Sequence, residues 1–175
     1  MTHDTHAEAP AKSAQRPPSP REETEHGGHG HAYVRLLIMA VLSFAAMYVL
    51  MYAMVDRFAH IHPNLNQAYM AALMAAPMVG IELALMSAMY PDRRLNVAAW
   101  ALSGIAFVGA WFGIREQAAI GNEEFLRSMI PHHSSAILMC REAQITDAEI
   151  RQLCRNIVAS QQAEIDQMEA LLARR

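Results

Sequence analysis

Three long apolar segments constrain the fold of this chain more than any other feature of its sequence. They run from Leu36 to Val55, from Ala68 to Tyr90 and from Leu95 to Ile114. Each has about 20 residues, the length that a helix needs to cross the hydrocarbon core of a bilayer. The first and third contain no charged residue, and the second contains only Glu82. We therefore predict three transmembrane helices.

The same segments could instead be the buried helices of a soluble bundle. Helices in such a bundle usually carry a polar face, and these segments carry none. Tyrosine and tryptophan also stand near several segment ends, where such side chains anchor helices at the membrane–water interface. The links between the segments are short, from Asp56 to Gln67 and from Pro91 to Arg94. These features favour membrane helices.

The rest of the chain divides into two parts of different composition. Residues 1–32 mix prolines with charges and end in HGGHGH, so they bury too little apolar surface to fold. We expect a disordered, histidine-containing tail there, followed by the three-helix membrane region over residues 33–115. Residues 116–175 have a soluble composition, and TDAE (Thr146–Glu149) is a capping box that predicts the start of a second helix after a short turn. The predicted fold class is all-α: three transmembrane helices and a C-terminal helical hairpin.

The arginines that flank the apolar segments indicate an orientation. Four of them lie near the bilayer on the side of the amino-terminal tail, and three lie on the side of the hairpin. The positive-inside rule then favours a cytoplasmic amino terminus, with the hairpin outside the cytoplasm. The first group is Arg21, Arg35, Arg93 and Arg94, and the second is Arg57, Arg115 and Arg127.

The stretch FLRSMIPHHSSAILMC combines methionine, proline and two adjacent histidines on one predicted helix. Met129 stands three residues before His132 and four before His133, so the three share a face. Pro131 has no N–H to donate to the carbonyl of Arg127, so we expect a kink that leaves room for a ligand.

Folding the predicted hairpin about its turn brings the second helix opposite this motif. Met129 and His133 then come level with residues 158–165. Gln161 and Glu164 would face the histidines there, and a glutamine within an apolar stripe needs a polar partner.

Methionine and histidine together indicate which metal such a site would prefer. Thioether sulfur is a soft ligand that suits Cu(I), and imidazole accepts several metals. Zinc sites use cysteine, histidine and carboxylate, and the Glu-x-x-His pattern of di-iron bundles is absent from residues 115–175. The pattern favours Cu(I), with Ag(I) as its chemical mimic. The alternative is a kinked core helix whose histidines lie beside gap-filling methionines, and spacing alone does not separate the two.

FLRSMIPHHSSAILM followed by SQQAEIDQM (Ser160–Met168) resembles the DUF305 family of bacterial proteins, whose pattern is Met-Ile-Pro-His-His and then Gln-x-x-Glu-Ile-x-x-Met. The resemblance covers residues 121–173. It implies a ferritin-like helical bundle, binding of Cu(I) and Ag(I) in the periplasm, and here an anchor in the inner membrane of a bacterium. The ligands that it implies are Met129, His132, His133, Met139 and Met168, with Gln161 and Glu164 as supporting groups.

This chain departs from the family pattern at two points. It has one hairpin where soluble members have two, and one hairpin buries little surface, so we expect a second copy or the membrane helices to complete the bundle. Cys140 stands where the family often has a small apolar residue, and Cys154 would face it from the other helix. The two cysteines could form a disulfide, bind copper as thiols or pack as apolar residues, and we favour the last.

The second apolar segment carries a pattern of its own. Met74, Met78 and Glu82 step by four residues along it. An ionisable residue inside a membrane helix is functional by default, so these residues define a possible ion path. The alternative is that the methionines are ordinary packing and that Glu82 pairs with Ser103 or with a tyrosine.

These features predict a membrane-anchored Cu(I)- and Ag(I)-binding protein for copper storage, buffering or relay in metal tolerance. The sequence shows no nucleophile–base pair, phosphate-binding loop or hydrolytic metal motif, so we do not expect an enzyme. Its formal net charge of -3 does not suggest a nucleic-acid partner. The expected partners are the lipid bilayer and a second copy. The alternatives are a metal-ion transporter component that uses the Glu82 path, and a structural or regulatory membrane subunit without metal.

Overall fold

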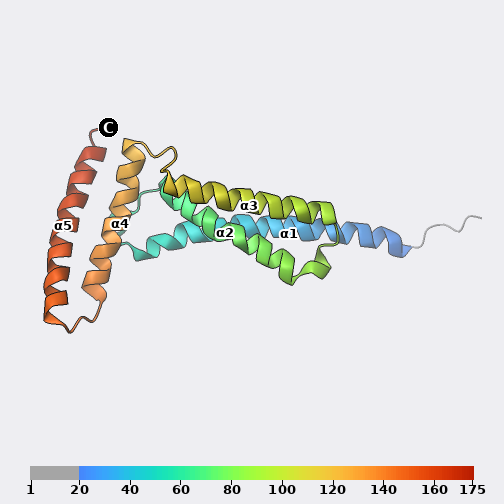
Figure 1. The fold of residues 1–175 in the computed structure, drawn as a ribbon, viewed down its shortest axis with the longest axis horizontal. Helices are drawn as coiled ribbons and strands as arrows, with labels where there is room; N and C mark the ends of the chain where they lie inside the picture. The colour runs from blue at the N-terminus through green and yellow to red at the C-terminus, as the bar shows by residue number, and fades with distance from the viewer. Residues whose placement is uncertain (1–19) are drawn as a thin grey trace, which may run out of the picture.

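The structure is a computed structural model that describes residues 20–175, with side chains from Gly30 onward. All regular elements of this part of the chain are helical, so the predicted all-α class is confirmed (Figure 1). The α-helices are α1 (Pro20–Leu50), α2 (Leu65–Leu85), α3 (Arg93–Arg115), α4 (Asn122–Glu142) and α5 (Ala148–Leu172). Short 3₁₀ helices lie between the α-helices: η1 (Met51–Met54) and η2 (Phe58–His60) between α1 and α2, and η3 (Ser87–Met89) between α2 and α3.

The amino-terminal tail is only partly covered by the structure. Residues 1–19 of the predicted disordered tail lie outside the described residues. Residues 20–32, which the sequence also assigned to that tail, belong to α1.

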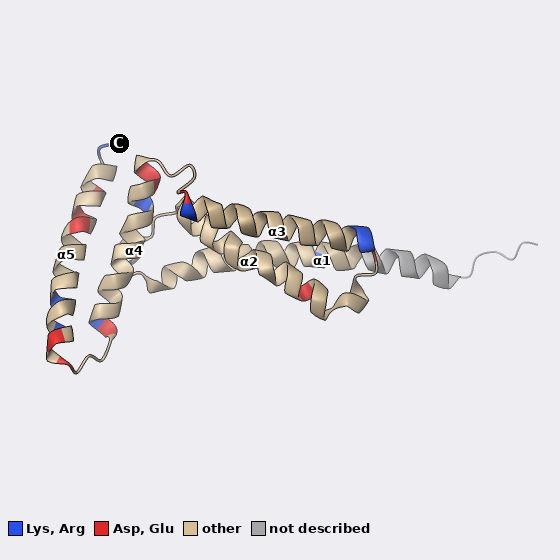
Figure 2. Cartoon of the chain, in the orientation of Figure 1, with Lys and Arg blue, Asp and Glu red and all other residues tan. Residues whose placement is uncertain are grey.

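Helices α1, α2 and α3 form an elongated bundle, and α4 and α5 form a hairpin that lies across one end of it (Figure 1). Three stretches are long and apolar enough to cross a membrane, as predicted: Gly30–Met54, Leu65–Leu85 and Arg93–Arg115. Charged residues gather on the hairpin and near the ends of the bundle, and the lengths between are almost free of them (Figure 2). This distribution supports membrane association of the bundle.

Small residues hold the membrane helices together. The buried positions of α2 are mostly alanine and glycine, which let neighbouring backbones approach closely. A Cβ atom added to Gly80 would lie 2.7 Å from Cζ3 of Trp100 on α3, so any larger residue there would require the ring to shift. Most large apolar side chains of the bundle are instead exposed on its outer surface, where lipid would surround a membrane bundle.

The hairpin has an aliphatic core of a kind common in water-soluble proteins. Its buried side chains are Leu126, Ile130, Ile137, Ile165 and Met168. Asp147 caps α5 by accepting hydrogen bonds from the N–H groups of Glu149 and Ile150. The cap is thus one residue later than the Thr146 that the capping box indicated.

The proline of α4 helps to attach the hairpin to the membrane bundle. Pro131 leaves the carbonyl of Arg127 without its helical partner. The side-chain amide of Asn64, which also caps α2, donates to that carbonyl at 3.5 Å. Helix α4 continues through the proline from Asn122 to Glu142. The freed carbonyl is therefore used for docking.

A buried serine makes a second attachment. Ser134 is fully buried, and its Oγ accepts a hydrogen bond from the N–H of Asp56 at 2.8 Å. The same hydroxyl lies 2.8 Å from Nδ1 of the buried His60 in the first link. The carboxylate of Asp56 in turn accepts from Arg141 at 2.6 Å. These contacts fix one face of α4 against the first link.

Candidate functional site

His133 lies between α4 and α5 with both ring nitrogens engaged. Its Nδ1 is 2.9 Å from the carbonyl oxygen of Met129, and its Nε2 is 2.7 Å from the carboxylate of Glu164. Only 7% of the residue is exposed. A neutral imidazole has one N–H, so both contacts are satisfied together only by the protonated ring or by a proton on Glu164. His133 thus joins the two helices, and a metal would have to displace one partner to reach it.

Three other predicted site residues of the hairpin lie in separate environments. Met168 is buried in the aliphatic core, whereas Met139 is 53% exposed on the outer surface of α4. Gln161 is half-buried, and its side chain makes no hydrogen bond within the described part of the chain. The structure therefore does not gather the five predicted ligands at one point.

Met129 and His132, by contrast, lie in one common environment. Both line a pocket of about 610 Å³ between α4 and the adjoining ends of the membrane helices. His132 is exposed, and no hydrogen bond or ion pair occupies its ring among the residues described. Its ring centroid lies 6.2 Å from that of His133. Of the two adjacent histidines, His132 is the one with a free ring beside a methionine.

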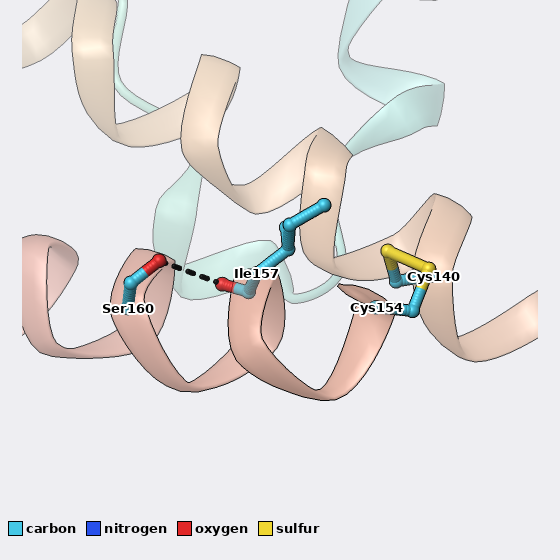
Figure 3. The surroundings of a disulfide bond; sticks show 4 residues. All are labelled: Cys140, Cys154, Ile157 and Ser160. Atoms are coloured by element: carbon cyan, nitrogen blue, oxygen red, sulfur yellow. Dashed lines mark hydrogen bonds between the residues drawn. A yellow bond between two sulfur atoms is a disulfide. The ribbon is translucent and has the colours of Figure 1, made fainter. Parts of the chain in front are cut away.

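A disulfide joins Cys140 to Cys154, next to the turn between α4 and α5 (Figure 3). The Cα atoms are 5.2 Å apart, within the range that a disulfide spans. This corrects our preference for two packed apolar residues, and it leaves neither cysteine as a thiol ligand. Facing positions on the two packed helices bring the sulfur atoms within bonding distance, and sequence spacing indicates such positions only roughly.

The first link contributes histidines that the predicted site did not include. His60 holds Ser134, and Nε2 of His62 is buried without a hydrogen-bond partner in the structure. Burial lowers the pKa of His62, opposed by the nearby Glu169 carboxylate and assisted by Arg127 and His60. The sequence signal for both is His-Ile-His in a short link that the predicted topology puts on the same side as the hairpin, and by itself it is a weak indication of a site.

The possible ion path in α2 shows a local pairing. The hydroxyl of Tyr90 donates to Glu82 at 3.2 Å, and Ser103 donates to the carbonyl of Ala76 instead. This is the tyrosine pairing that the sequence offered as the alternative. Met74 is exposed on the bundle and Met78 is half-buried.

The described residues contain no group of three or more histidine, cysteine, aspartate or glutamate side chains that could hold a metal ion. Methionine sulfur, which does not count toward such a group, is a further ligand for soft metals such as Cu(I). Met129 beside the free ring of His132 is an arrangement of that chemistry.

Comparisons with known proteins add a family match to this geometry. The family described as "Domain of unknown function (DUF305)" matches residues 114–172. "Uncharacterized protein L153" of Acanthamoeba polyphaga mimivirus is 33% identical over 143 residues, which are 80% of this chain and 92% of that protein. The family match covers only residues 114–172, so the 143 residues aligned with this relative also include part of the apolar helices. No solved structure matches the chain.

Proposed function

The chain belongs to the DUF305 family, and from this premise we propose that it is a membrane-anchored protein that binds Cu(I), with Ag(I) as a mimic, to store, buffer or relay copper in metal tolerance. It acts as a binding protein and not as an enzyme. Copper is its cargo and not a resident cofactor.

The observation that carries the proposal is the pairing of Met129 with His132 at an open pocket. The two side chains are three residues apart on α4, and both line the pocket. Thioether sulfur favours Cu(I), and a neutral imidazole is a compatible second ligand. The exposed ring of His132 makes no hydrogen bond among the described residues, so it can bind without losing a partner.

His133 and Glu164 have a supporting role in this proposal. Their contact at 2.7 Å joins α5 to α4 at the residue next to His132. The bond from His133 to the Met129 carbonyl fixes the same helical turn. These contacts hold the turn that carries both ligands, so His133 positions the site instead of binding the metal.

The disulfide supports a hairpin outside the cytoplasm. Disulfides persist in oxidising compartments and are rare where thioredoxin and glutathione keep thiols reduced. With three membrane helices, an extracytoplasmic hairpin means a cytoplasmic amino terminus, in the inner membrane if the host is a bacterium. A reporter that works only outside the cytoplasm should be active when fused after Arg175, and its inactivity there would reverse the orientation.

A second copy remains the expected partner of the hairpin. Phe125, Ile150 and Leu153 are each about half exposed, which leaves apolar surface for another hairpin to cover. Sedimentation of the full chain in detergent should give a dimer. A monomer at all concentrations would contradict self-association but not metal binding.

The metal-binding test uses the full chain in detergent micelles and a chromogenic Cu(I) chelator as competitor. The variants Met129→Leu and His132→Ala should each lower Cu(I) affinity by about tenfold or more, since each removes one ligand. Leucine replaces methionine at similar volume, so Met129→Leu should leave the fold intact.

Met139→Leu is the matched control, because Met139 is an exposed methionine of the same helix that lies outside the pocket. It should bind Cu(I) as the parent does. Parent protein that does not compete with the chelator, or that binds Zn(II) more tightly than Cu(I), would refute the proposed function.

A further inference from the structure

The pocket beside α4 is lined by methionines of the membrane region as well as by Met129. Met51 and Met54 reach it from η1, and Met70 reaches it from the second turn of α2. Four of the chain's 13 methionines thus line one pocket, and they come from three separate elements, of which α4 is far from the other two in the sequence. His132 completes the set of soft or borderline donors there.

The three methionines of the membrane region are not buried in a core, whereas Met129 packs against the core of the hairpin. Met54 is 52% exposed and Met70 is 40% exposed, and Met51 is half-buried. Methionine in a protein interior usually fills irregular gaps and is covered. Here the thioethers border an open volume of about 610 Å³, which leaves their sulfur atoms room to approach a ligand.

The charge of the pocket selects the kind of ion. No aspartate or glutamate is among the described residues that line it, and its other polar groups are neutral amides and hydroxyls. Hard divalent cations prefer carboxylate oxygens, which this lining lacks. Neutral sulfur and imidazole ligands suit a soft monovalent ion such as Cu(I) or Ag(I).

Hydrogen bonds on both sides hold the two walls of the pocket together. The amide of Asn66 on α2 donates to Ser128 on α4 at 3.3 Å, and it also bonds to Gln117 in the link between α3 and α4. The N–H of Leu65 donates to the carboxylate of Glu124 at 2.9 Å. The membrane wall and the hairpin wall are therefore fixed in register, as a shared site requires.

We propose that one Cu(I) site lies at the junction of the membrane bundle and the hairpin, and that its ligands are drawn from Met129 and His132 of the hairpin and from Met51, Met54 and Met70 of the membrane region. This inference rests on the proposed function and goes further, because it makes the hairpin alone an incomplete site. Cargo held there lies between the helices that span the bilayer and the domain outside it.

The first test compares two triple variants of the full chain in detergent micelles, with Cu(I) and a chromogenic chelator as the probe. Replacing the membrane-side methionines of the pocket, Met51→Leu, Met54→Leu and Met70→Leu, should lower Cu(I) affinity by about tenfold or more. The control replaces one half-buried and two exposed methionines outside the pocket, Met47→Leu, Met86→Leu and Met89→Leu. The control should stay within about twofold of the parent.

The outcomes separate the inference from the proposed function. If the pocket triple variant binds as the parent does while Met129→Leu loses affinity, copper binding stands and the shared site is refuted. If the parent does not bind Cu(I), both are refuted. Equal losses in the two triple variants would also overturn the shared site, because position in the pocket would then not matter.

A second measurement on the unaltered protein does not depend on variant folding. Bound Ag(I) should protect the pocket methionines Met51, Met54, Met70 and Met129 from oxidation by peroxide, as read by mass spectrometry. Met139 is more than half exposed outside the pocket and should oxidise equally with and without Ag(I). Protection limited to hairpin methionines would contradict the shared site.

Discussion

The membrane bundle and the hairpin are both built of helices, but different forces hold them. In α2 the buried side chains are mainly alanine and glycine, and most large apolar side chains of the bundle face outward. In the hairpin the buried side chains are large aliphatics such as Ile130, Ile137 and Ile165. Lipid tails are as apolar as leucine, so membrane helices gain from close approach, whereas hairpin helices gain from removing apolar surface from water.

Polar contacts occur within the bundle and also where the two regions meet. Within the bundle they include the contacts of Tyr33 with Asp92 and Asn96 and the bond from Tyr90 to Glu82. Where the regions meet, Asn64 donates to the carbonyl of Arg127, and Ser134 accepts from the N–H of Asp56. Directional bonds of this second set join the hairpin to the bundle.

The largest expected effect comes from the hairpin core. Ile165→Ala removes a fully buried side chain and should destabilise the hairpin by about 2–5 kcal/mol. Thermal unfolding of the full chain in nanodiscs, monitored by hydrogen exchange of the hairpin amides, measures this loss of stability.

The matched control is Ile105→Ala on the outer face of α3, where the side chain is 69% exposed. It should cost no more than about 0.5 kcal/mol, as exposed substitutions usually do. Equal losses of stability at the two positions would contradict the distinction between a hairpin held by buried aliphatic side chains and a bundle whose large apolar side chains face outward.

An intermediate effect is expected at a close contact of the bundle. Gly80→Ala places a Cβ atom against the ring of Trp100, and the ring must shift. Overpacking of this kind costs about 1–3 kcal/mol, so the melting temperature of the bundle should fall. Gly104→Ala is the control, because a Cβ atom there meets nothing within 4 Å. A bundle equally stable with either alanine would show that close helix approach at Gly80 does not hold it together.

The smallest expected effect is a loss of stability at acidic pH, which arises from His62 at the junction of the bundle and the hairpin. Burial lowers the pKa of His62 below its value of about 6.5 in the unfolded chain. Below about pH 6.5 the unfolded state therefore binds a proton that the folded state resists, and stability falls as pH falls. Above that pH His62 is neutral in both states and contributes no pH dependence. Melting temperatures of the full chain, measured from about pH 7.5 to about pH 5.5 so that the range brackets this pKa, give the dependence of stability on pH.

His62→Gln separates this residue from other groups that titrate in the same range. Its neutral amide cannot charge, so its melting temperature should fall less on acidification than that of the parent. The charged neighbours Glu169 and Arg127 are retained in the variant. Identical slopes in the two proteins would exclude His62 as a source of the acid sensitivity.

The sequence by itself determined the helical architecture and part of the hairpin's register. Three uncharged or nearly uncharged segments of bilayer length leave few alternatives to membrane helices, because a soluble helix needs a polar face. Helical periodicity and a short turn placed Glu164 level with His133, and the two side chains meet at 2.7 Å. Local rules were enough for these results, since each depends on residues close in the chain or on one turn.

Only the tertiary structure decided which side chains are free to bind. His132 and His133 have nearly the same spacing from Met129, but neighbouring residues on a helix point about 100° apart. Packing of α5 against α4 engages His133 through Glu164 and leaves His132 at the pocket. Which side of α4 is covered depends on contacts between segments some 60 residues apart, and these have no signature in the local pattern.

The same reason explains the cysteines and the membrane-side methionines. Sequence spacing put Cys140 and Cys154 on facing helices, but only their 5.2 Å Cα separation distinguishes a disulfide from packing. Met51, Met54 and Met70 read as ordinary methionines of apolar segments until the hairpin folds across the end of the bundle. Their proximity to Met129 arises from the way the hairpin docks, and docking is set by side-chain hydrogen bonds that only the folded chain can form.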